Sequence, residues 1–256
     1  MNMIECGIVT GAAGFLGHIH SKSILDLYAG LVIVDINKKK LEKLYKNLKI
    51  NYPKKKILKF NLDITKEKKI IELEKKIRKK LFFTRVLINN AALDPKPNKN
   101  AKKSFNWDKE LNVGLKASYL FIKHFSKQMI KKKDGCIINI ASDLSIIAPT
   151  HTIYKNVFGN FKKPVTYSVI KHGLIGLTKY YAALYGEYNI TCNAISPVGV
   201  YNNQDKLFLK RLSNLIPMKR LANKSDIKNI IDFLINKNQK FITGQNIAVD
   251  GGRTIV

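Results

Sequence analysis

Short apolar runs rich in β-branched residues alternate with lysine-rich stretches of helical period along the whole chain. Strands that are apolar throughout and separated by helices indicate a parallel sheet covered on both faces. The pattern therefore predicts an α/β fold, a doubly wound parallel sheet of about seven strands. The predicted strands are Glu5–Thr10, Leu31–Asp35, Lys56–Asn61, Arg85–Asn89, Gly135–Ala141, Ile190–Ile195 and Asn246–Val249. The predicted helices include Lys38–Asn51, Lys66–Lys80, Trp107–Lys132, Tyr167–Tyr188 and Ser225–Asn236.

No repeat, low-complexity linker or change in composition marks a domain boundary within the 256 residues. This length allows one large domain or two small ones, and the unbroken alternation predicts a single domain over residues 1–256. Two loops are long, Asp94–Lys103 and Ser142–Thr166. Both follow predicted strands, at the sheet edge where parallel sheets bind ligands. The segment 143–166 is therefore predicted to be an inserted substrate loop.

The chain is strongly basic, with 46 Lys and Arg against 18 Asp and Glu and a net charge of +28. The lysines are interleaved with Glu and with apolar positions of the predicted helices. This distribution indicates a solvated surface rather than a specific nucleic-acid site. A positive field still favours anionic ligands, including nucleotide cofactors and sugar phosphates.

Mean hydropathy is −0.14, and no uninterrupted apolar run approaches the roughly 20 residues of a membrane-spanning helix. The first residues lack the basic region of a signal peptide, so a cytoplasmic protein without a membrane partner is expected. Cys6, Cys136 and Cys192 lie far apart in apolar stretches and form no CxxC pair. They are predicted to be small core residues on strands, and no metal site is expected.

The segment "IVTGAAGFLG" follows the first predicted strand directly and begins a helix. Its glycines, Gly11, Gly14 and Gly17, permit a tight turn and let backbone amides and a helix N-terminus approach a pyrophosphate. In this context the pattern predicts a Rossmann-like dinucleotide turn, with Phe15 and Leu16 beside the phosphates. The alternative is a glycine-rich turn without a ligand.

Asp35 ends the second predicted strand, in "LVIVDIN". A carboxylate at this position can accept hydrogen bonds from both hydroxyls of an adenosine ribose and would repel the 2′-phosphate of NADP. NAD is therefore the predicted cofactor. Lys38, Lys39 and Lys40 could soften that repulsion, so NADP stays open. The structural alternative for Asp35 is a helix N-cap.

Tyr167 lies four residues before Lys171, so both side chains share one helix face. The spacing alone proves nothing, because it recurs at three other places, Tyr45–Lys49, Tyr52–Lys56 and Tyr119–Lys123. Only Tyr167 follows a strand that ends in serine, and only its helix leads into "NAISP". A neighbouring ammonium favours the phenolate, which can take a proton from a substrate hydroxyl.

With these residues the chain resembles the single-domain form of the short-chain dehydrogenase/reductases over essentially its whole length. The resemblance lies in "TGAAGFLG" (10–17), Asp35, "LDI" (62–64), "NNAA" (89–92), "LNVGLKASYLF" (111–121), "INIAS" (138–142), "YSVIK" (167–171), "NAISPVGV" (193–200) and "ITGQNIAVDGG" (242–252). It implies a catalytic tetrad of Asn112, Ser142, Tyr167 and Lys171. Tyr167 would exchange the proton, Ser142 would bind the substrate oxygen, Lys171 would also bind the ribose, and Asn112 would position a water.

The resemblance also implies further cofactor contacts, at Asp63, Ile64, Asn89, Ala91 and Pro197. Asn89 and its neighbour in "NNAA" have an alternative role, which is to satisfy backbone groups at the end of the sheet. Two departures from the family pattern are Phe15, where many members have glycine, and Val198 after Pro197. Neither removes a catalytic group.

The gap between Ser142 and Tyr167 is about twice the usual family spacing, so the insert should shape the substrate pocket. With Ser142, the substrate contacts expected are His151, Tyr154 and, from the loop "VGVYNNQDKLFLKRLSNLIPMKRLA", Asn202. Such polar groups suit a hydroxylated ligand. The segments "IAP", "PVTYSVIKHGL" and "ISPVGVYNNQD" resemble oxidoreductases of bacterial flagellin-glycan and nonulosonate (legionaminic-type) surface-sugar pathways, which implies a sugar or sugar-phosphate substrate.

Two other functions remain open at this point. One is 3-oxoacyl-carrier-protein reductase, against which the insert and Asp35 argue. The other is a catalytically silent regulator that binds a cofactor or a polyanion, against which the complete tetrad argues. The resemblance further implies a homodimer or homotetramer assembled through the helices Trp107–Lys132 and Tyr167–Tyr188.

Overall fold

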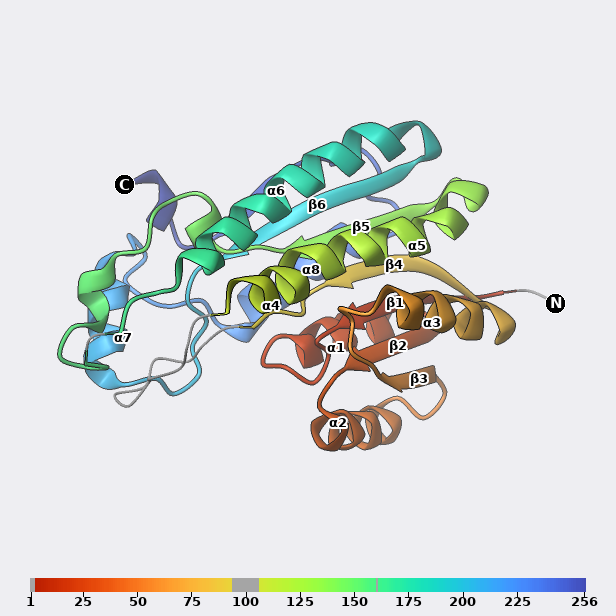
Figure 1. Ribbon diagram of the computed structural model, residues 1–256, viewed down its shortest axis with the longest axis horizontal. Coiled ribbons are helices and arrows are strands. Elements are labelled where there is room, and N and C mark those ends of the chain that lie inside the picture. Colours follow the sequence, from red (N-terminus) through yellow and green to blue (C-terminus); the bar gives the residue numbers. More distant parts are fainter. Residues whose placement is uncertain (1–2, 94–105, 160) are drawn as a thin grey trace.

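The computed structural model describes residues 3–93, 106–159 and 161–256. One parallel sheet runs through it in the order β3-β2-β1-β4-β5-β6-β7 (Figure 1). The order reverses between β1 and β4, so the predicted doubly wound, single-domain fold is confirmed. The strands are β1 (Ile4–Thr10), β2 (Gly30–Asp35), β3 (Lys56–Asn61), β4 (Phe82–Asn89), β5 (Gly135–Ile140), β6 (Ile190–Pro197) and β7 (Asn246–Val249).

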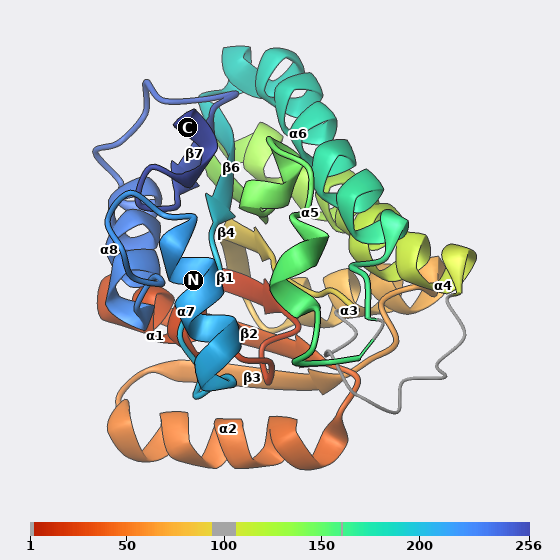
Figure 2. The same ribbon diagram turned by 90° about the vertical axis from the view of Figure 1, so that its left-hand side faces the viewer.

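Helices cover both faces of the sheet, as Figure 2 shows in end view. One face carries α1 (Gly17–Leu27), α2 (Lys38–Asn51), α7 (Lys206–Asn214) and α8 (Lys224–Ile235). The other carries α3 (Glu67–Lys79), α5 (Ala117–Lys132) and α6 (Val165–Tyr185), with the short α4 (Trp107–Leu111) before α5. Among the described residues, no helix is long and apolar enough to cross a membrane.

The strands are apolar throughout because successive side chains enter different cores. Ile8 packs with the α3, α5 and α6 layer, whereas its neighbour Val9 packs with the α1, α2 and α8 layer. Each side chain removed from water in this way contributes about 2 kcal/mol. Cys6, Cys136 and Cys192 are buried in β1, β5 and β6, which confirms the prediction that they are core residues.

Two predicted elements need correction. The predicted helix Trp107–Lys132 is interrupted by a π-helical turn at Asn112–Lys116, where the Ala117 amide donates to the Asn112 carbonyl. Such an extra residue per turn hardly changes the apolar pattern, so periodicity does not reveal it. A loop was expected after Pro197, but this segment contains α7. The backbone amides of Leu207 and Phe208, in the first turn of α7, donate to the Asp205 carboxylate.

The amino end of the sheet contains a partly buried ion pair, in which the arginine is the buried member. Arg85 of β4 donates from Nε to Asp134 Oδ2 at 2.8 Å and from Nη1 to the Tyr28 hydroxyl. Tyr28 donates in turn to the Ile235 carbonyl at 2.5 Å, and Lys240 pairs with the other oxygen of Asp134. This cluster joins β4 to the segments that precede β2 and β5 and to the end of α8.

Candidate active site

The glycine turn after β1 is too close-packed for side chains at two positions. Gly11 has φ of 61°, and a Cβ there would lie 2.8 Å from the Ala91 Cα. A Cβ at Gly17 would lie 2.3 Å from the Gly11 carbonyl oxygen. The turn therefore requires glycine at both positions, and it presents backbone directly to whatever binds above it.

A side chain absent from the predicted site holds this turn. Asn90 Nδ2 donates to the carbonyls of Thr10 and Gly11, at 3.0 Å each. Thr10 Oγ1 accepts the amides of Asn90 and Ala91 at 3.0 and 3.2 Å. Asn90 therefore satisfies backbone groups at the end of the sheet, which was the alternative role for the segment "NNAA". Asn89 is buried and donates to Asn139 within the sheet at 2.9 Å.

Asp35 lies against the glycine turn. Its Oδ2 accepts the Ala13 amide at 2.9 Å, and its Oδ1 accepts the Asn37 amide at 2.8 Å. The N-cap of α2 is Asn37, which accepts the Lys40 amide, so the N-cap alternative for Asp35 is wrong. The half-buried carboxylate keeps lone pairs for a further donor.

Asp63 follows β3 and is occupied locally. Its Oδ1 accepts from the Thr65 hydroxyl at 2.7 Å and from the Thr65 amide at 3.0 Å. The Thr65 hydroxyl bond is the main cause that lowers the pKa of Asp63 below its ordinary value. Ile64 is buried beside it. Asp35 ends β2 and Asp63 follows β3, so both carboxylates lie at the carboxyl end of neighbouring strands.

The structure brings Lys171, Tyr167 and Ser142 to the carboxyl end of β5. Lys171 is only 5% exposed and donates from Nζ to the Ile140 carbonyl at 2.7 Å. Its Nζ lies 5.5 Å from the centre of the Tyr167 ring. Ile140 ends β5 and Ser142 follows two residues later, so α6 is anchored at the strand end that carries the serine.

A second lysine also lies over the tyrosine. Lys163 lies in the segment just before α6, and its Nζ is 3.8 Å from the centre of the Tyr167 ring. Tyr167 is therefore close to two cations, from the insert and from α6. Cations over an aromatic face are attracted by the ring's electrons.

Asn112 begins the π-helical turn, which packs closely on α6. A Cβ at Gly114 would lie 2.7 Å from the Ile170 Cγ2. Glu110 accepts a hydrogen bond from Thr166, at the beginning of α6. These contacts bring the segment of Asn112 beside the helix of Tyr167 and Lys171.

Ser142 has partners that the sequence did not indicate. Its Oγ donates to Asp143 Oδ1 at 2.8 Å and accepts the Leu144 amide at 3.2 Å. Asp143 Oδ2 pairs with Arg253 Nη1 at 2.5 Å. The sequence signal was an acidic residue directly after the serine, but this does not identify the partner of that residue.

The insert packs on α7 through an aromatic cluster. Tyr154 is 7% exposed, stacks on Phe208 at 5.6 Å and meets Phe161 edge-on at 5.1 Å. Arg211 of α7 donates to the carbonyls of Thr152 and Lys155. The Tyr154 ring thus lies inside this cluster rather than at the surface.

The other predicted substrate and cofactor positions differ in exposure. His151 and Asn202 are exposed, whereas Pro197 is buried at the end of β6. The predicted loop Asp94–Lys103 lies outside the described residues. Among the described residues, no group of three His, Cys, Asp or Glu could hold a metal.

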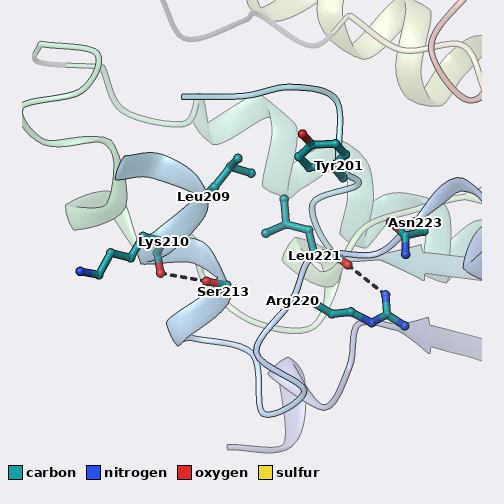
Figure 3. Close-up of a pocket in the computed structure, with 7 residues that line it drawn as sticks. All are labelled: Tyr201, Leu209, Lys210, Ser213, Arg220, Leu221 and Asn223. Atoms are coloured by element: carbon teal, nitrogen blue, oxygen red, sulfur yellow. Dashed lines mark hydrogen bonds between the residues drawn. The ribbon is translucent and has the colours of Figure 1, made fainter. Parts of the chain in front are cut away.

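A hollow of about 260 Å³ lies between α7 and the segment that leads to α8 (Figure 3). Arg220 in its wall is paired with Asp226 at 2.6 Å. Lys224, which follows Asn223 of the lining, lies 5.0 Å from the ring centre of Phe15 in the glycine turn. No residue of the predicted tetrad lines the hollow. The lining residues are Tyr201, Leu209, Lys210, Ser213, Arg220, Leu221 and Asn223.

A sequence model described as Enoyl-(Acyl carrier protein) reductase matches residues 11–254. The NAD-dependent glycerol dehydrogenase of Listeria innocua is 27% identical over 256 residues, covering 98% of this chain and 94% of that protein. The 3-oxoacyl-(acyl-carrier-protein) reductase FabG of Buchnera aphidicola is 35% identical over 202 residues, covering 77% and 78%. Post-translational flagellin modification protein A of Campylobacter coli is 29% identical over 248 residues, covering 95% and 96%.

Solved structures share the fold. A short chain dehydrogenase from Leptospira borgpetersenii with bound NAD+ has a TM-score of 0.83 and 25% identity, with 99% of this chain and 94% of that chain covered. A gluconate 5-dehydrogenase from Burkholderia cenocepacia in complex with NADP and tartrate has a TM-score of 0.84 and 21% identity, with 100% and 97% covered.

Proposed function

The chain belongs to the short-chain dehydrogenase/reductase family, and on that premise we propose that it transfers hydride between NAD and a CH–OH or C=O group of a sugar-type substrate. The observation that carries the proposal is the anchoring of Lys171, below Tyr167, to the carbonyl that ends β5, two residues before Ser142. In this arrangement Tyr167 as acid–base group, Lys171 as its neighbouring cation and the Ser142 hydroxyl would act on the same substrate oxygen.

The residues present fit a nicotinamide dinucleotide. The turn at Gly11 and Gly17 has no room for side chains, which suits a pyrophosphate. Asp35 keeps acceptor capacity for ribose hydroxyls, which favours NAD, while Lys38–Lys40 are exposed beside it.

Asp35→Asn keeps an acceptor and removes the charge, so the ratio of kcat/KM for NAD to that for NADP should fall about tenfold, or about 1.4 kcal/mol.

The chain's own groups would perform the proton chemistry. Tyr167 would take the proton of a substrate hydroxyl during oxidation and return it during reduction. Lys171 and Lys163 would stabilise its phenolate. Ser142 would bind the substrate oxygen, and Asn112 would hold a water for proton relay. The bound cofactor supplies the hydride acceptor or donor.

One relative at nearly full coverage, a glycerol dehydrogenase, supports a hydroxylated substrate, and another is a flagellin modification protein. Relatives of similar coverage also include 3-oxoacyl-(acyl-carrier-protein) reductases. The cationic and polar side chains of the insert, including His151 and Lys163, suit a sugar or sugar phosphate better than an acyl chain. We therefore place the proposed reaction in surface-carbohydrate biosynthesis, in the cytoplasm.

A second candidate is 3-oxoacyl-(acyl-carrier-protein) reductase. It is supported by the relative that is 35% identical. The description of the matching family names a different reaction, that of an enoyl reductase, but also an acyl carrier protein. Asp35 opposes it, because it disfavours NADPH. The two candidates differ in substrate class and in cofactor, so one assay separates them.

A homodimer or homotetramer is also part of the proposal. Tyr119 of α5 and Tyr180 and Leu184 of α6 are exposed large side chains on the two helices expected at the interface. Burying such side chains between copies would stabilise an oligomer. Sedimentation of a 29.1 kDa species would refute this part.

The test is cofactor reduction by the pure protein with NAD or NADP and a panel of polyols, hexoses, hexose phosphates and nucleotide sugars. Tyr167→Phe should lower kcat about 10²- to 10⁴-fold, since it removes the proton-transfer group. Tyr119→Phe is the matched control, because Lys123 lies over that ring in the same i, i+4 spacing. Silence with the panel together with NADPH oxidation by acetoacetyl thioesters would favour the acyl reductase.

A further inference from the structure

The Ser142 hydroxyl is held by the residue that follows it. Its single hydrogen is donated to Asp143 Oδ1 at 2.8 Å, and one lone pair accepts the Leu144 amide at 3.2 Å. The same Asp143 oxygen accepts the Leu144 amide at 2.9 Å. The remaining lone pair can accept from a substrate hydroxyl, and rotation about the Cβ–Oγ bond can redirect the hydrogen to a substrate oxygen.

The backbone of Ser142 is fixed independently of Asp143. The Ser145 hydroxyl donates to the Ser142 carbonyl at 2.6 Å and contacts the Ser196 hydroxyl of β6 at 3.0 Å. The Ala141 amide donates to the Ile195 carbonyl at 2.8 Å. A change at Asp143 is thus expected to act on the serine side chain rather than on its backbone.

Asp143 is itself held from the other end of the chain. Its Oδ2 pairs with Arg253 at 2.5 Å, and the two side chains are 4% and 6% exposed. Arg253 lies in the turn after β7, where the Asp250 carboxylate accepts the Gly252 and Thr254 amides at 3.0 and 2.9 Å. Hydrogen bonds thus connect the turn at Asp250, through Arg253 and Asp143, to the serine.

We propose that Asp143 is a positioning residue that, together with the Leu144 amide, holds the Ser142 Oγ in place, and that Arg253 sets how strongly Asp143 holds the serine hydrogen. This inference rests on the proposed function, because it takes Ser142 to contact the substrate oxygen. To stabilise that oxygen, Ser142 must turn its hydrogen away from Asp143. An unpaired carboxylate holds such a hydrogen strongly, whereas the ion pair shares the charge with Arg253 and eases the exchange.

The kinetic test is a double-mutant cycle. Asp143→Ala and Arg253→Met should each lower kcat about 10- to 100-fold. In Asp143→Ala the serine oxygen loses a partner that holds its rotamer, and in Arg253→Met the unpaired carboxylate retains the serine hydrogen. The dissociation constant for NAD, measured by calorimetry, should not change. Arg253→Lys should restore part of kcat. In a Ser142→Ala background, Asp143→Ala should have no further effect, because it acts only through the serine.

A second arm needs no substrate. Urea midpoints are measured for Ser142→Ala, Asp143→Ala and the double variant. If Asp143 holds the serine hydroxyl, the urea midpoint of the double variant should fall by less than the sum of the decreases in the two single variants. Additive shifts would overturn the inference.

The kinetic outcomes separate the two proposals. An equal loss of kcat from Asp143→Ala with and without Ser142 would overturn the positioning role and leave the proposed function intact. An unchanged kcat for Ser142→Ala would contradict the role of the serine in the proposed function, and the inference with it. A changed NAD affinity in Asp143→Ala would indicate a structural role instead.

Discussion

Two arginine–aspartate pairs, one partly buried and one fully buried, lie at opposite ends of the parallel strands. At the amino end, Arg85 pairs with Asp134, and at the carboxyl end, Arg253 pairs with Asp143. The first acid is 28% exposed and has a second cation, Lys240. The second is 4% exposed and touches the serine of the proposed site. The same two residue types therefore meet in different surroundings.

The surroundings reverse the effect on ionisation. Burial opposes ionisation of Asp134, but Lys240 and Arg85 together outweigh it and lower its pKa. Burial raises the pKa of Asp143, and Arg253 with the Ser142 and Leu144 hydrogen bonds only partly offsets it. The Arg85–Asp134 pair, which holds elements together, favours the ionised carboxylate. In the Arg253–Asp143 pair, which must release the serine hydroxyl, burial and the attraction of the arginine oppose each other more evenly.

Removing the acid at the amino end should have the largest effect on stability. Asp134→Ala leaves the Arg85 guanidinium buried and unpaired, which should cost about 3–5 kcal/mol of unfolding free energy. The kcat of the folded fraction should stay unchanged, in contrast to Asp143→Ala. Urea denaturation and assays at matched folded fractions measure both, and a lower kcat for Asp134→Ala would remove the distinction between the pairs.

Removing the arginine should cost less at the amino end than at the carboxyl end. After Arg85→Met, Lys240 still pairs with Asp134 and Tyr28 still donates to Ile235, so we expect a loss of about 1–2 kcal/mol. Arg253→Met leaves Asp143 unpaired and should cost about 3 kcal/mol. Urea midpoints, with unchanged m-values, measure the two losses of unfolding free energy. A larger loss for Arg85→Met than for Arg253→Met would contradict the prediction.

Lys240→Met should have a smaller effect still. The lysine and Asp134 are each 28% exposed, and Arg85 remains as the buried partner. The loss of unfolding free energy should be below about 1 kcal/mol. A loss equal to that of Asp134→Ala would mean that Lys240, not Arg85, stabilises this end of the sheet.

The acid dependence of stability should differ in sign between the pairs. Asp134 has a lowered folded pKa, so its contribution is present above its unfolded pKa and is lost as pH falls through the folded value. Asp143 has a raised folded pKa, so its protonation favours the folded state as pH falls towards the unfolded value. Urea midpoints between pH 3 and 6, compared with Asp134→Asn and Asp143→Asn, should show opposite slopes.

Local patterns predicted much of the fold and part of the site. The strands, the glycine turn and the Tyr167–Lys171 spacing depend on neighbours within a few residues, and the structure contains each of them. The helix α7 was missed although Asp205 and the apolar pattern after it were visible. The role of Asn90 in holding the turn required knowing that β1 and β4 are adjacent.

The sequence by itself determined the layered α/β fold, because strand and helix periods and turn glycines act over short distances. Only the tertiary structure decided which charged side chains meet. Asp143 and Arg253 are 110 residues apart, and Arg85 and Asp134 are 49 apart. Nothing in the local pattern links either pair. Their partnership arises when the ordered strands bring their ends together, and burial then sets the strength and ionisation of each pair.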